Sequence, residues 1–141
     1  MAGDVSLVTE LGPSRVRPTV LVVEDEVLIR LLIASELRDL GIQVLEASNA
    51  EEALKILESA LPVHVLFTDI RMPGRMDGIG LSRVARARYP HLKLILTSSH
   101  QPENSARASA DVFVSKPYDL NAVMRQVETL LTRSGDEPGH R

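Results

Sequence analysis

Thr19-Val20-Leu21-Val22-Val23-Glu24-Asp25-Glu26 is the stretch of sequence that decides the fold. Up to Val23 it is a continuous apolar run rich in β-branched residues, which is typical of a strand buried on both faces of a parallel sheet. The run then ends abruptly at three acidic residues. This stretch therefore predicts an α/β domain with carboxylates at the carboxyl end of its first strand.

Short apolar runs and helical spacing alternate along the rest of the chain. Val27, Leu28, Leu31, Leu32 and Leu40 recur at helical spacing directly after the first strand. The whole pattern predicts strands at 19–23, 43–47, 63–68, 92–96 and 112–114, and helices near 27–40, 50–60, 79–89, 103–110 and 120–131. Five strands that are each followed by a helix imply parallel pairing with right-handed crossovers, so we expect a doubly wound α/β sheet.

Composition narrows the class of protein. The chain has 141 residues, 44% of them hydrophobic and 25% charged, which suits one globular domain. A net charge of -3 argues against direct nucleic-acid binding, and the absence of cysteine excludes disulfides and a cysteine nucleophile. No apolar run is long enough to span a bilayer, so we expect a cytoplasmic protein without membrane insertion. The breaker-rich ends predict tails at 1–18 and 133–141 around a domain at 19–132.

Four of the predicted strands end at residues whose side chains could bind a ligand or react. In doubly wound sheets, ligands bind outside the carboxyl ends of the strands at the switch point. Glu24 and Asp25 follow the first strand and Asp69 ends the third, which should lie beside the first. Three carboxylates in one crevice repel one another unless a cation neutralises them, and oxygen ligands favour Mg²⁺. No histidine or cysteine stands at these positions, which argues against zinc.

Two further strand ends complete the predicted site. Lys116 follows the fifth strand and can pair with Asp69 at rest or with a phosphoryl oxygen. Ser98 follows the fourth strand and offers a hydroxyl donor, with Thr97 as the alternative in a neighbouring register. A carboxylate nucleophile, a divalent cation, an ammonium group and a hydroxyl together are typical of a phosphoryl-transfer site.

These residues and their neighbours resemble the receiver domain of two-component response regulators. The resemblance covers roughly Thr19 to Leu131, and its most specific parts are Asp69-Ile70-Arg71-Met72-Pro73, Met76-Asp77-Gly78 and Lys116-Pro117. It implies the (βα)5 flavodoxin-like receiver fold with strand order 2-1-3-4-5. It further implies a stand-alone receiver with no output domain, which is not an enzyme of ordinary turnover but assists its own phosphorylation and dephosphorylation.

The resemblance also assigns a role to each matching position. Asp69 would accept a phosphoryl group from the phosphohistidine of a sensor histidine kinase or phosphotransfer protein, and would then switch binding to a downstream protein target. Mg²⁺ would be the cofactor. Its ligands would be Glu24, Asp25, Asp69 and the backbone carbonyl of Arg71, while Lys116, Ser98 (or Thr97) and the aromatic Phe113 would bind the phosphoryl group or move with it.

Two departures from the family pattern stand out. The loop Met72–Gly78 is one residue longer than the commonest form, and the stretch from Ser98 to Lys116 is shorter than usual. The short stretch should shrink the fourth helix and the surface that it contributes to signalling. A receiver-like interaction module that never uses phosphorylation is therefore the main alternative function.

Two other classes of protein fit the sequence less well. A flavodoxin-like cofactor binder needs a Gly/Ser/Thr-rich phosphate loop after the first strand, and this chain has Glu24-Asp25-Glu26 there. An aspartate-nucleophile phosphatase needs a second acid two residues after the nucleophile, and that position is Arg71.

Overall fold

The computed structural model describes residues 17–99 and 110–136, and within them forms one five-stranded parallel sheet. The strands are β1 (Thr19–Val23), β2 (Gln43–Ala47), β3 (Val65–Asp69), β4 (Lys93–Ser98) and β5 (Val112–Ser115). Their order is β2-β1-β3-β4-β5, and every neighbouring pair is parallel. The predicted doubly wound sheet and its strand order are confirmed.

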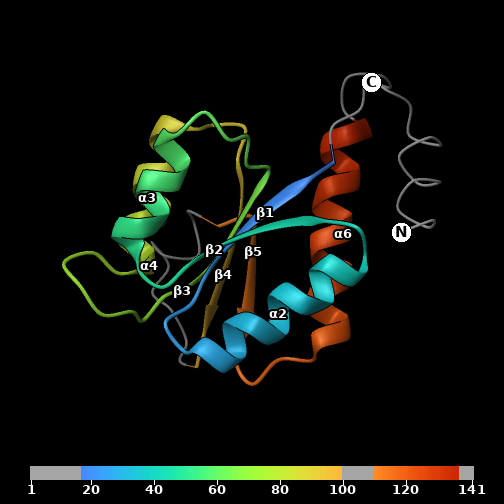
Figure 1. Cartoon of the computed structure of the whole chain (residues 1–141), viewed down its shortest axis with the longest axis horizontal. Coiled ribbons are helices and arrows are strands. Elements are labelled where there is room, and N and C mark those ends of the chain that lie inside the picture. Colours follow the sequence, from blue (N-terminus) through green and yellow to red (C-terminus); the bar gives the residue numbers. More distant parts are fainter. Residues whose placement is uncertain (1–16, 100–109, 137–141) are drawn as a thin grey trace.

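Helices cover both faces of this sheet, as Figure 1 shows. On one face lie α2 (Val27–Asp39) and α6 (Leu120–Asp136), and on the other lie α3 (Ala50–Glu58) and α4 (Gly78–Arg88). The end of α6 reaches into the stretch from 133 onward for which the sequence predicts a tail. The helix expected at 103–110 falls almost entirely outside the described residues.

The first strand is buried from end to end, as its sequence predicts. Its side chains alternate between two hydrophobic clusters. Val20 and Val22 pack with α2 and α6, and Leu21 and Val23 pack with α3 and α4. Both faces of β1 are covered and Glu24 directly after it is also buried, so the chain first reaches solvent at Asp25.

The first helix forms where its spacing predicts, but it buries a different face from the most apolar one. Ile33, Ala34 and Leu37 are its buried residues. Apolar side chains of the other stripe point outward, with exposed fractions of 53% for Val27, 81% for Leu28, 47% for Leu31 and 50% for Leu32. A helix that leaves leucines exposed beside the carboxyl ends of the strands presents an unusual surface for a monomer.

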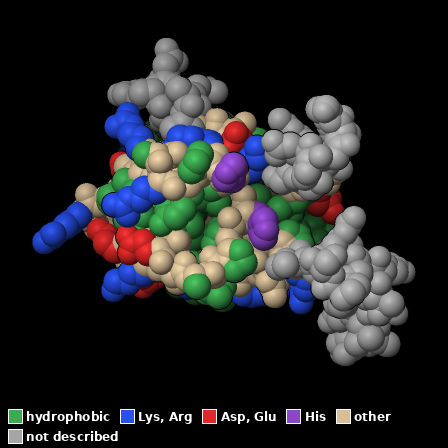
Figure 2. Space-filling view, turned by 90° about the horizontal axis from the view of Figure 1, so that it is seen from above, with side chains coloured by type: hydrophobic (Ala, Val, Ile, Leu, Met, Phe, Trp, Pro, Cys, Tyr) green, Lys and Arg blue, Asp and Glu red, His purple; other side chains and the backbone are tan. Residues whose placement is uncertain are grey.

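Charged side chains of both signs lie on the face seen from above (Figure 2). Figure 2 shows that, on the face seen from above, basic side chains lie around the margin without gathering into one patch. Among the described residues, no helix is both long and apolar enough to cross a membrane.

Candidate functional site

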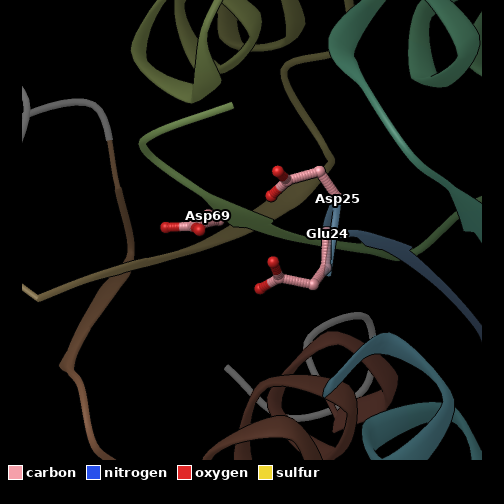
Figure 3. Close-up of side chains that lie close together, drawn as sticks. All are labelled: Glu24, Asp25 and Asp69. Carbon is pink, nitrogen blue, oxygen red and sulfur yellow. The ribbon is translucent and has the colours of Figure 1, made fainter. Parts of the chain in front are cut away.

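The carboxyl ends of β1 and β3 bring three carboxylates together. Val23 of β1 pairs with Thr68 of β3, so the next residues, Glu24 and Asp69, lie on adjacent strand ends. Oxygen atoms of Glu24, Asp25 and Asp69 lie within 4.8 Å of one another. Figure 3 shows the three side chains extending from neighbouring strand ends toward the same side. The convergence of carboxylates expected from the sequence is thus present in the structure.

Lys116 bridges the two buried carboxylates of this cluster. Its ammonium nitrogen lies 3.0 Å from Oδ2 of Asp69 and 3.3 Å from Oε1 of Glu24. The side chains are 17% exposed for Lys116, 9% for Asp69 and 1% for Glu24. Asp25, by contrast, is exposed at the rim. Because one ammonium group faces two carboxylates, the buried part of the cluster retains excess negative charge when all three groups are ionised.

A backbone hydrogen bond anchors Lys116, and an aromatic residue follows it two positions further along the chain. The Lys116 N–H donates to the carbonyl of Ser98 at 2.8 Å, which ties the end of β5 to the end of β4. Tyr118 packs edge-to-face on Phe67, with ring centroids 6.3 Å apart. Burial raises the pKa of Tyr118 to about 12, so the phenol is neutral in the core at physiological pH.

Burial and the charge of Lys116 shift the pKa of Glu24 in opposite directions, and burial and the neighbouring carboxylates do the same to the pKa of Lys116. Burial raises the pKa of Glu24, and the Glu26 N–H and Lys116 only partly oppose this change. Burial lowers the pKa of Lys116, but its hydrogen bond to Asp69 and the charges of Asp69 and Glu24 outweigh burial, so the pKa is raised. Lys116 is therefore firmly protonated, and burial is the main influence on the pKa of Glu24.

A glycine keeps the chain close behind Asp69. The Gly78 N–H donates to the carbonyl of Ile70 at 2.8 Å. A Cβ atom at Gly78 would lie 2.0 Å from the carbonyl oxygen of Asp69, far inside contact distance, so only glycine fits there. The Met-Asp-Gly motif that the sequence singles out thus has a packing role directly behind Asp69.

The long loop between Asp69 and Gly78 is fastened to α3. Oε2 of Glu51 accepts a hydrogen bond from the Arg75 N–H at 3.2 Å. Gly74 has a positive φ of 111° at the same contact. Arg71, whose carbonyl the resemblance to receiver domains implies as a cation ligand, lies on the exposed first part of this loop.

The two candidate hydroxyls differ in their register with Asp69. Thr97 of β4 is the pairing partner of Asp69, and partners in a parallel ladder direct their side chains to the same face. The Thr97 hydroxyl is buried and has no hydrogen-bond partner. Ser98 is also buried, but it is paired with Ser115 and its carbonyl is engaged by Lys116.

Phe113 lies on β5, where it pairs with Leu96. Its neighbours Val112 and Val114 pack against the cluster formed with α2 and α6, so alternation turns Phe113 toward the opposite face. Phe113 is half-buried there.

One residue near the site was not predicted from the sequence. Arg30 on α2 donates from Nη1 to the backbone carbonyl of Glu24 at 2.9 Å. The only available signal was a basic residue inside the otherwise apolar stretch 27–34, and nothing in the spacing indicated its partner.

The donor set suits a small divalent cation. All three side chains offer carboxylate oxygens, and hard cations such as Mg²⁺ prefer oxygen ligands and need only one or a few carboxylates. Burial raises the pKa of Glu24, and the nearby charge of Asp69 raises it further, so a cation at the cluster would favour the ionised form of Glu24.

Comparison with known proteins gives a consistent answer. A family model described as "Response regulator receiver domain" matches residues 20–128. A putative NtrX-like response regulator of Rickettsia conorii is 36% identical over 120 residues, which are 82% of this chain and 24% of that protein. The chain therefore corresponds to about a quarter of the length of this curated relative.

Solved structures agree with the sequence comparison. The response regulator TrrA of Thermotoga maritima, in complex with Mg²⁺-BeF, is 30% identical with a TM-score of 0.72, over 80% of this chain and 98% of that one. The receiver domain of NtrX from Brucella abortus is 31% identical with a TM-score of 0.72, also over 80% and 98% of the two chains.

The bridging lysine should be important for stability. We expect Lys116→Met to lower the free energy of unfolding by about 3 kcal/mol at pH 7 in EDTA, because it leaves two buried carboxylates without their cation. Urea unfolding followed by circular dichroism measures this change, since the chain has no tryptophan.

Two further variants test this reason. Adding Asp69→Asn to Lys116→Met removes one of the two carboxylate charges and should restore about 1–2 kcal/mol. Arg88→Met breaks the exposed Arg88–Glu58 pair, whose side chains are 56% and 53% exposed, and should change little. An equal, small effect of Lys116→Met and Arg88→Met would refute the importance of the buried pair.

Proposed function

The chain belongs to the response regulator receiver family, and we propose that it acts as a phosphoacceptor in a two-component phosphorelay, with Asp69 taking the phosphoryl group. The contact that best supports this role is that of the Lys116 ammonium group with Asp69 at 3.0 Å and with Glu24 at 3.3 Å. An aspartate nucleophile beside a cation that can pair with the transferred group suits phosphoryl transfer, in which positioning and charge neutralisation supply most of the catalysis.

In the proposed reaction, a carboxylate oxygen of Asp69 attacks the phosphorus atom of a phosphohistidine on a partner protein. The P–O bond to Asp69 forms as the P–N bond breaks, and the imidazole nitrogen keeps the electron pair of that bond and takes a proton. Lys116 then exchanges a carboxylate contact for a phosphoryl oxygen. The chain would thereby assist its own phosphorylation and dephosphorylation as a signalling domain.

Glu24, Asp25, Asp69 and the backbone carbonyl of Arg71 are the proposed Mg²⁺ ligands. When bound, Mg²⁺ neutralises the carboxylates and the charge of the phosphoryl oxygens. The similar TrrA protein was solved in complex with Mg²⁺-BeF, which supports this choice of cation.

Of the two hydroxyls, Thr97 is the better candidate for the phosphoryl contact. It shares the face of Asp69 through their pairing, and its buried hydroxyl lacks a partner. A buried hydroxyl without a partner is costly unless a ligand satisfies it, and a phosphoryl oxygen on Asp69 would do so. Ser98 is then proposed to anchor the backbone of Lys116.

The surface beside the site supports a protein partner. The outward stripe of α2 begins directly after Asp25 and Glu26, and Leu28 in it is 81% exposed. A cavity of about 350 Å³, lined by Leu32, Lys116 and Tyr118 among others, continues this apolar surface to the site. We assign this surface to the sensor histidine kinase or phosphotransfer protein that brings the phosphohistidine to Asp69.

Phosphorylation would be read by a downstream protein in the cytoplasm. A new phosphoryl group would change the pairing of Lys116, and Phe113 on β5, the strand that ends just before Lys116, is the aromatic proposed to move with it. The alternative is a binding module that never uses phosphorylation, and the next experiment separates the two.

The mass of the intact protein tests the phosphoacceptor role. After incubation with acetyl phosphate and Mg²⁺, we expect wild-type protein to gain one phosphoryl group, while Asp69→Asn should gain none because the nucleophile is gone. Chelation of Mg²⁺ should abolish the gain in wild type. An equal gain in Asp69→Asn would assign the phosphoryl group to another residue, and no gain even with a phosphorylated kinase would favour the phosphorylation-independent module.

The hydroxyl assignment has its own test. Thr97→Ala should slow phosphorylation by acetyl phosphate about tenfold, because one hydrogen bond to a charged oxygen is lost. Thr97→Ser should retain most of the rate, and Ser98→Ala should stay close to wild type. A larger loss in Ser98→Ala than in Thr97→Ala would reverse the assignment.

A further inference from the structure

The chain turns from β1 into α2 at Glu24, Asp25 and Glu26, which form an acidic corner, and Arg30 donates a hydrogen bond to the backbone of this corner. The Glu24 N–H still follows the sheet, donating to the carbonyl of Ala47 at 3.1 Å. β2 ends at Ala47. Beyond that end of the strand, the Glu24 carbonyl accepts from Nη1 of Arg30 at 2.9 Å.

Glu46 on β2 sets the orientation of Arg30. Its Oε1 atom lies 3.1 Å from Nε of Arg30, and its Oε2 atom lies 3.1 Å from Nη2 of Arg38. The Arg30 side chain is only 17% exposed. A planar guanidinium held by two different acceptors has little freedom, so the edge strand and α2 together hold the donor that faces Glu24.

The backbone of this corner is linked directly to a carboxylate of the cluster. The Glu26 N–H donates to Oε2 of Glu24 at 3.0 Å, while Oε1 of the same carboxylate faces Lys116 at 3.3 Å. A change in the path of the backbone from Glu24 to Glu26 would therefore reorient the Glu24 carboxylate and the neighbouring Asp25 as well.

We propose that Arg30, oriented by Glu46, is a positioning residue for cation binding, because it holds the Glu24–Glu26 corner in the conformation that makes the three carboxylates converge. This role rests on the cation site proposed above. Partners outside the ligand set that orient metal ligands affect metal affinity in many proteins. Here the contact is to the backbone of a ligand residue, and it comes from an α2 side chain that Glu46 of the edge strand β2 orients.

Whether replacement of Arg30 strengthens or weakens Mg²⁺ binding distinguishes a positioning role from a purely electrostatic one. Arg30 is a cation near an acidic cluster, so loss of its charge alone would strengthen the binding of another cation. Loss of its hold on Glu24 would weaken binding instead. Arg38 provides the matched control, because it is an arginine on the same helix paired with the same Glu46, and its hydrogen bonds go to Glu46 and the Val44 carbonyl.

Calorimetric titration with MgCl₂ at constant ionic strength tests this inference. We expect Arg30→Gln to bind Mg²⁺ about tenfold more weakly than wild type, and Arg38→Gln to bind within about twofold of it. Glu46→Gln should weaken binding to an intermediate extent, which gives a second test if Arg30→Gln fails to fold. Equal or tighter binding by Arg30→Gln, or equal weakening by Arg38→Gln, would overturn the role.

Amide exchange of the metal-free protein distinguishes this inference from the function on which it rests. By NMR, the Glu26 amide should exchange about tenfold faster in Arg30→Gln than in wild type, and at the wild-type rate in Arg38→Gln. If wild type fails to bind Mg²⁺ while this contrast appears, the cation site is wrong and the positioning of the corner stands. If the Glu26 amide is unaffected in Arg30→Gln, the positioning role fails.

Discussion

The structure depends on one electrostatic constraint, the repulsion among carboxylates at adjacent strand ends. Glu24 and Asp69 are buried because β1 and β3 are covered by helices on both faces, and Asp25 joins them at the rim. One lysine cannot compensate three such groups, so the cluster favours a further cation. The surrounding contacts maintain this arrangement. Lys116 pairs with the buried acids, and Arg30 donates a hydrogen bond to the Glu24 carbonyl. Gly78, which has no side chain, lets its own backbone pack against the Asp69 carbonyl.

Much of the fold could be predicted because local pattern and tertiary structure agree. The β1 run is apolar on both faces, and alternating strands and helices leave few topologies open. The buried face of α2 could not be predicted in the same way. Its sequence carries two apolar stripes on opposite sides, one at 27, 28, 31 and 32 and one at 29, 33, 34 and 37. Periodicity gives the helix in either case, and only packing against the sheet and α6 selects the less leucine-rich stripe.

The candidate site shows the same division between what a sequence reveals and what it hides. Glu24, Asp25, Asp69 and Lys116 could be found because each stands at a strand end, and parallel strands bring those ends together. The contact of Arg30 could not be predicted, because a side chain that donates to a backbone carbonyl requires no particular residue type at the accepting position. The hydroxyl register was equally hidden. Thr97 and Ser98 are adjacent and similar, and only the pairing of β3 with β4 identifies Thr97 as the partner of Asp69.

The most direct measurement of the central claim is a titration of the metal-free chain with Mg²⁺, comparing wild type with Asp25→Asn. Asp25 is exposed and lies outside the contacts of Lys116, so its substitution should leave the fold intact while removing one ligand. The account predicts saturable binding of one Mg²⁺ ion by wild type and markedly weaker binding by Asp25→Asn. Absence of saturable binding by wild type, or identical affinity in the two proteins, would contradict it.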